Sequence, residues 1–140
     1  MKSFAFKKCR YFLGRLERGA DILAGLTAFC NTEDIEAGTI SAIGAVESGG
    51  VGYFDQAASE YREMRFDQGM EIASLTGNIS LRDGKVFLHC HVLLADEQGR
   101  CFGGHLLDGN IAFACEFSIQ ALTGEPPLRL PDEATGLFLW

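Results

Sequence analysis

Apolar and polar residues alternate along most of this chain with a period of two, which is typical of β-strands. In the first half, the alternation predicts five strands, at residues 4–8, 11–16, 39–46, 51–54 and 62–66. Residues 55–61 lack the pattern and are expected to form a surface loop, whereas the chain from residue 70 onward is almost entirely β-patterned. The chain is therefore expected to fold around a sheet.

One segment, from about Ala20 to Thr32, has the helical period instead. Its apolar residues form one stripe: Ile22, Leu23, Leu26, Phe29 and Cys30. Asp21 is expected in the first turn, where a carboxylate favours the positive end of the helix dipole. Gly44 and Gly52, inside extended runs, indicate bulges or a close approach by another segment. The expected fold class is α+β: a mostly antiparallel sheet with one main helix, about residues 20–32, packed on it.

Turn residues predict the strand register between residues 75 and 94. Asp83-Gly84 between two β-patterned runs favours a two-residue type I′ hairpin. In that register Asn78 lies opposite His89 and Thr76 lies opposite His91. One face of the hairpin is then apolar, and the other is polar and carries the histidines.

The next turn, residues 96–100, suits a three-residue loop that ends with Gly99 in the left-handed conformation. This loop places His105 opposite His91 and diagonal to His89. Opposed Cβ atoms lie about 4.5–5.5 Å apart and diagonal ones about 7–8 Å. All three histidines of the chain thus fall on one patch, beside Gly103 and Gly104, which carry no side-chain bulk.

Three imidazoles at these separations can bind one ion at about 2.0–2.1 Å. The sequence therefore predicts a site for zinc or another divalent transition metal, with three ligands (His89, His91, His105) and four lining residues (Thr76, Asn78, Gly103, Gly104). The alternative is that the histidines are only hydrogen-bonded, to Asn78 or Thr76. A one-residue change in the loop would also move His105 to the opposite face.

A fourth protein ligand is not evident, and an open position is typical of catalytic zinc sites. Glu71 and Glu116 are candidate bases or outer-sphere residues for such a site. Glu116 interrupts the apolar strand 111–119. The alternative is that both are solvated residues on a polar face.

The formal net charge is −7, but basic residues crowd the first eighteen positions, which carry six lysines and arginines and only one acid. Lys2, Lys7, Lys8 and Arg10 are candidate contacts to an anionic partner. A charged edge strand that limits aggregation is the alternative. The acidic remainder repels a phosphate backbone, so any DNA binding is expected to be weak and indifferent to sequence.

With 140 residues, 47% of them hydrophobic, the chain is expected to be one globular domain over 1–140. Neither a signal peptide nor a membrane span is expected, and the five dispersed cysteines include no Cys-x-x-Cys pair. A cytoplasmic location follows as an expectation. Dinucleotide-binding, Walker-loop, His-Glu-x-x-His and Gly-x-Ser-x-Gly signatures are all absent from the sequence.

The chain resembles the plant and prokaryote conserved (PPC) domain family in its stand-alone prokaryotic form. The similar stretches run in order along nearly the whole chain: 19–23, 41–46 with 52–55, 71–78, His89-Cys-His91 and 103–109. The resemblance implies an α+β domain that forms a homotrimer, with a zinc-type site at His89, His91 and His105. Plant relatives join this domain to AT-hooks that bind AT-rich DNA, but this sequence has no Arg-Gly-Arg-Pro hook.

Three functions remain as hypotheses. The first is a homotrimeric metal-binding protein that acts as a binding or regulatory module. The second is a metal-dependent enzyme acting on a small substrate, and the third is a DNA-binding protein that uses the basic N-terminal strands. Phe87, Leu93 and Leu107 share the histidine face, and an apolar patch of that kind predicts an interface.

Overall fold

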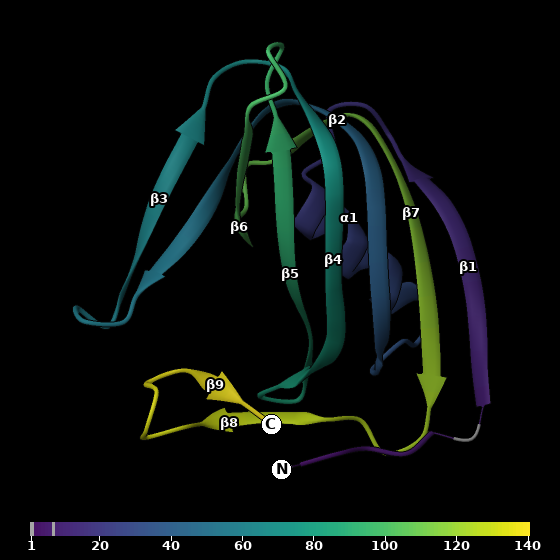
Figure 1. Ribbon diagram of the computed structural model, residues 1–140. Helices are drawn as coiled ribbons and strands as arrows, with labels where there is room; N and C mark the ends of the chain where they lie inside the picture. Colours follow the sequence, from purple (N-terminus) through teal and green to yellow (C-terminus); the bar gives the residue numbers. More distant parts are fainter. Residues whose placement is uncertain (1, 7) are drawn as a thin grey trace.

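The structure, a computed structural model, describes residues 2–6 and 8–140 and is mostly strand, with one short helix in that part of the chain. The elements are β1 Lys8–Leu16, α1 Ile22–Thr32, β2 Gly38–Asp55, β3 Glu60–Phe66, β4 Met70–Arg82, β5 Lys85–Ala95, β6 Cys101–Leu106, β7 Ile111–Thr123, β8 Leu128–Pro131 and β9 Phe138–Leu139 (Figure 1). A dominant sheet with one helix against it was the expected architecture.

Two strand boundaries differ from the expectation because pairing continues through residues that look like turns. The strand predicted at 11–16 begins earlier, at Lys8, and pairs as β1 with β7 from Lys8 to Leu16 without a break, whereas residues 4–6 of the strand predicted at 4–8 are not in a strand. The runs predicted at 39–46 and 51–54 are one strand, β2. Gly49 and Gly50 stay extended because β3 pairs with them.

The long strand β2 organises the sheet. Its first half lies between β7 and β4, and its second half pairs with β6 and β3. Since β6 pairs with β5 and β5 with β4, strands β2, β6, β5 and β4 form a closed ring of neighbours. The register of β2 shifts at Gly44, whose φ of 138° disfavours other residues, so the predicted bulge is confirmed.

Both predicted hairpin registers are confirmed. Asn78 pairs with His89 and Thr76 with His91 across the Asp83-Gly84 turn, where both turn residues have positive φ. His91 pairs with His105 across the second turn. One parallel pairing, between β4 and β8, was not expected in this antiparallel sheet.

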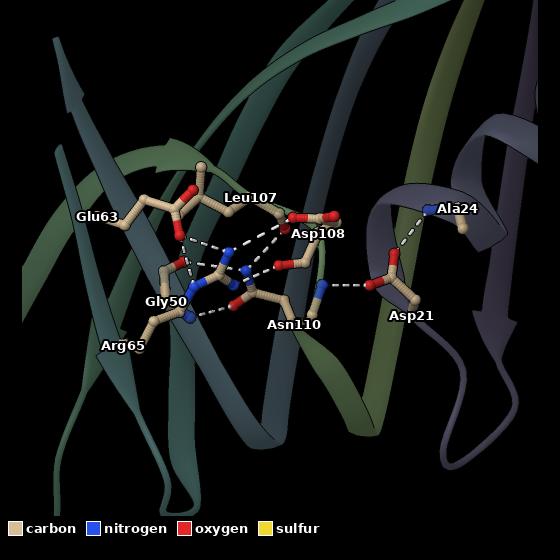
Figure 2. Close-up of polar contacts among 9 residues, drawn as sticks. Asp21, Ala24, Gly50, Glu63, Arg65, Leu107, Asp108 and Asn110 are labelled. Atoms are coloured by element: carbon tan, nitrogen blue, oxygen red, sulfur yellow. Dashed lines mark hydrogen bonds and ion pairs between the residues drawn. The ribbon is translucent and has the colours of Figure 1, made fainter. Parts of the chain in front are cut away.

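Helix α1 packs on the inner face of the sheet, against β1, β5 and β7. Ile22, Leu26 and Cys30 are fully buried there, as the apolar stripe predicts. Asp21 precedes the helix as its N-cap instead of lying in the first turn. One carboxylate oxygen accepts a hydrogen bond from the Ala24 amide, and the other accepts one from Gly109 (Figure 2).

A buried asparagine fixes the turn after β6 to β2. Asn110 is fully buried; its side-chain oxygen accepts from the Gly50 amide, and its Nδ2 donates to the carbonyls of Gly50 and Leu107 (Figure 2). Beside it, Arg65 of β3 bonds to Asp108. These contacts position the end of β6, which carries His105.

Candidate metal centre

The three histidines meet on the outer face of the sheet, opposite α1. Their ring centroids lie 5.4 Å (His89–His91), 4.9 Å (His89–His105) and 5.5 Å (His91–His105) apart. One ring nitrogen from each lies within 4.8 Å of the other two. The cluster follows from the two hairpin turns, because each turn sets which residues share a face and a row.

Burial favours the neutral form of two of these rings, His89 and His105. The pKa of His89 falls to about 4, first because of burial and then because of the charges of His105, Arg129 and His91. The pKa of His105 is lowered by burial and by His91 and Arg129. A metal ligand must be a neutral imidazole, so at neutral pH both rings are in the form that binds metal. The donor set of three imidazoles fits zinc and other divalent transition metals.

The predicted lining residues surround the cluster in different ways. Asn78 pairs with His89, but its side-chain oxygen accepts a hydrogen bond of 2.9 Å from Arg129. Thr76 pairs with His91 and is exposed. A Cβ on Gly103 would meet Leu93, and one on Gly104 would meet the carbonyl of Gly52. Gly104 therefore allows β2 to approach β6 closely.

The predicted bases lie elsewhere. Glu71 is on β4 opposite Ala95, four pairs of the β4–β5 ladder away from the Thr76–His91 pair. Glu116 is on β7 between Arg15 and Ile43, with β2 separating it from β4. The cluster of potential ligands within residues 2–6 and 8–140 contains only the three histidines.

The C-terminal residues contribute a group that sequence reasoning missed. Arg129 of β8 is only 5% exposed and donates hydrogen bonds to Ser80 Oγ, to Asn78 and to the Phe138 carbonyl. The sequence signal that could have found Arg129 is the run Leu-Arg-Leu-Pro at 128–131, in which apolar residues flank a single charged residue. Charged residues are almost never fully buried unless they are paired, so a charged residue on the buried face of a strand indicates polar partners next to it.

Two hairpins, β2–β3 and β8–β9, enclose a pocket of about 550 Å³ over the histidines. Both extend to the same side of β5 in Figure 1. His89, His105 and Arg129 line this pocket, and the Tyr61 ring lies 5.4 Å from that of His105. Its carboxylates are Glu60 and Glu63 of β3, not the predicted Glu71 and Glu116.

Lys8 and Arg10, two of the N-terminal basic residues, lie on a strand remote from the cluster. Both are on the edge strand β1, paired with the end of β7, and Lys2 is exposed. Arg10 forms an ion pair with Glu33. Lys7 lies outside the described residues.

The model of the Plants and Prokaryotes Conserved (PCC) domain family matches residues 4–123, so the chain belongs to this family, as the resemblance implied. A solved metal-containing protein from Archaeoglobus fulgidus is 46% identical, with a TM-score of 0.95 over 100% of this chain and 99% of that one. A PPC protein from Pyrococcus horikoshii is 38% identical, with a TM-score of 0.93 over 100% of this chain and 96% of that one. A candidate DNA-binding protein from Bacteroides thetaiotaomicron is 29% identical, with a TM-score of 0.86 over 96% of this chain and 94% of that one.

Curated relatives are much longer than this chain. The bifunctional protein GlmU of Synechococcus sp. (strain JA-3-3Ab) is 32% identical over 124 residues, which are 87% of this chain and 19% of that protein. The chain thus spans about a fifth of the length of the curated relatives it matches. In the part of the chain that the structure describes, no helix is both long and apolar enough to cross a membrane.

Proposed function

We propose that this chain is a homotrimeric PPC protein that binds one divalent transition-metal ion, zinc first among them, and acts as a binding or regulatory module. The gathering of three imidazole nitrogens within 4.8 Å carries the proposal. Two lowered pKa values and a 46% identical metal-containing relative support it. Five free cysteines, three of them buried, agree with a reducing, cytoplasmic location.

Elemental analysis tests the metal directly. Protein purified without chelator, reconstituted with zinc and dialysed should contain about one ion per chain. A metal content near zero after reconstitution would remove the basis of the proposed function.

The proposed trimer is supported by the uncovered part of the outer face. Cross-strand partners share a face, and one row of partners runs from Leu13 across Ser118, Ser41 and Thr76 to His91. Leu13 is 89% exposed, and Ile43 and Tyr11, also exposed, are on the same strands. Of the three residues that the sequence predicts at an interface, Leu93 is exposed, whereas Phe87 and Leu107 are half-buried and line the pocket over the histidines.

The double substitution Leu13→Asp with Ile43→Asp should convert the trimer to monomers, because burying unpaired charges at an interface carries a large desolvation penalty. Light scattering at micromolar concentration should give the mass of three 15.2 kDa chains for the unmodified protein and of one for the variant. Leu130→Asp, at a similarly exposed leucine on β8, serves as the control and should stay trimeric. A monomeric unmodified protein would refute the trimer.

A metal-dependent enzyme is the second candidate, and the pocket over the histidines favours it. A metal ion held by three protein ligands keeps one coordination position open. At that position the ion can lower the pKa of a bound water or polarise a substrate oxygen. Zinc-dependent hydrolysis of 4-nitrophenyl acetate that disappears in His105→Ala would favour this function. Equal rates in the two proteins would exclude it for this ester.

DNA binding is the third candidate, and the Bacteroides relative is the observation that favours it. With a net charge of −7, binding should be weak, indifferent to sequence and steeply reduced by salt, since only backbone neutralisation is available. Replacing Lys2, Lys7 and Lys8 with glutamine should abolish it in a gel-shift titration. Tight selection of one DNA sequence at physiological salt, unaffected by these replacements, would contradict this prediction.

A further inference from the structure

Arg129 carries a buried charge without an acidic partner. Among the described residues, every ion pair involves another arginine, and the three hydrogen-bond acceptors of Arg129 are all neutral. Burying an uncompensated guanidinium costs several kcal/mol, so a structure that retains one normally supplies an anion. Burial and then the positive charge of Arg82 lower the pKa of Arg129, so Arg82 adds to the cost of this charge.

Neighbouring groups hold the guanidinium in place but do not neutralise it. Its central carbon lies 4.3 Å from the ring centroid of Trp140 and 5.1 Å from that of Phe87. The aromatic contacts and the three hydrogen bonds fix its orientation. A guanidinium has five N–H donors, of which the described residues accept three. Two donors therefore remain for a ligand.

The same pocket combines this cation with the histidines and an apolar wall. Arg129, His89 and His105 line it together with the apolar side chains of Phe54, Leu107 and Phe138. With neutral imidazoles, a bound divalent ion would add a second positive centre beside Arg129. A ligand that fits would have one anionic end and one apolar end.

We propose that this pocket binds a small monocarboxylic acid with an apolar or aromatic group, its carboxylate held by Arg129 beside the metal on the histidines. The proposal rests on the proposed metal site and specifies its ligand. A planar carboxylate matches the guanidinium edge and accepts two N–H donors. Glu60 and Glu63 line the same pocket and would repel a phosphate dianion more strongly than a monoanion.

Isothermal titration of the zinc-loaded protein with phenylacetate tests this. Phenylacetate should bind, whereas its uncharged isostere phenylacetamide and inorganic phosphate should bind at least about tenfold more weakly. Arg129→Gln should weaken phenylacetate binding by about 10- to 100-fold, the range expected for hydrogen bonds to a charged group. Arg129→Lys keeps the charge but loses the paired N–H donors of the guanidinium. Its affinity for phenylacetate should therefore lie between those of the unmodified protein and Arg129→Gln. Arg100→Gln is the matched control, because Arg100 is an exposed arginine that pairs with Asp96 and lies outside this pocket, and it should change the affinity less than about threefold.

The zinc content and thermal unfolding of each variant, measured alongside, separate loss of the site from loss of the fold. A protein with one zinc per chain that ignores phenylacetate, binds phosphate more tightly, or binds phenylacetate equally well in Arg129→Gln would overturn the carboxylate proposal and leave the metal proposal standing. A protein that takes up no zinc would overturn both. If Arg129→Gln does not fold, the comparison of Arg129→Lys with Arg100→Gln decides.

Discussion

Replacing His105 with alanine should weaken zinc binding by more than about 100-fold, because outer-sphere substitutions alone cost about 10- to 100-fold and this one removes a ligand. His105 lies on the outer face of β6, away from the core, so the metal-free variant should keep its secondary structure and unfold within about 1 kcal/mol of the metal-free parent. Competition titration against a chromogenic chelator measures the affinity, and circular dichroism measures the fold.

Glu116→Gln is the control for this experiment. Glu116 is exposed on β7 and lines a different pocket, beside Leu13 and Ile43. Its replacement should leave the zinc affinity unchanged within about twofold. Full zinc affinity in His105→Ala would mean that the ion binds elsewhere, and the assignment of the three histidines would then be wrong.

Replacing Asn110 with alanine should destabilise the protein by about 3 kcal/mol or more. The change leaves one backbone N–H and two carbonyls without their partner, and each unsatisfied buried group costs about 1–3 kcal/mol. Thermal unfolding at a fixed protein concentration should shift down by roughly 10 °C. Zinc affinity should fall as well, because Asn110 ties the chain after His105 to β2.

Asn31→Ala, at an exposed asparagine in the last turn of α1, is the matched control and should change stability by less than about 0.5 kcal/mol. If Asn110→Ala unfolds no earlier than this control, the buried network in Figure 2 does not hold the β6–β7 turn.

The register of β4, β5 and β6 could be predicted from the sequence because short turns have few solutions. Asp83-Gly84 and Gly99 adopt the positive φ values that the two hairpin types require, and each hairpin then fixes every pair along its ladder. The cluster of His89, His91 and His105 follows from those two turns. Local chemistry thus determined the part of the site that lies on consecutive strands.

The rest of the pocket depends on contacts between distant segments, which alternation does not encode. β8 pairs in parallel with β4, and this brings Arg129 over Asn78 and Ser80, about fifty residues earlier in the chain. No residue within 128–131 indicates which strand of the sheet β8 pairs with. Glu71 and Glu116 looked like candidate bases for a similar reason, because a sequence pattern places a carboxylate on a face but does not give its distance from the site: Glu71 is four pairs away along the β4–β5 ladder, and Glu116 is on β7, beyond β2.

The most direct test of the metal centre is an anomalous difference map from crystals of the zinc-reconstituted protein, measured on both sides of the zinc absorption edge. The proposed function predicts one strong peak per chain, at about 2.0–2.1 Å from a ring nitrogen of each of His89, His91 and His105. A map from fully reconstituted protein with no peak at these imidazoles, or with its peak at other residues, would contradict it.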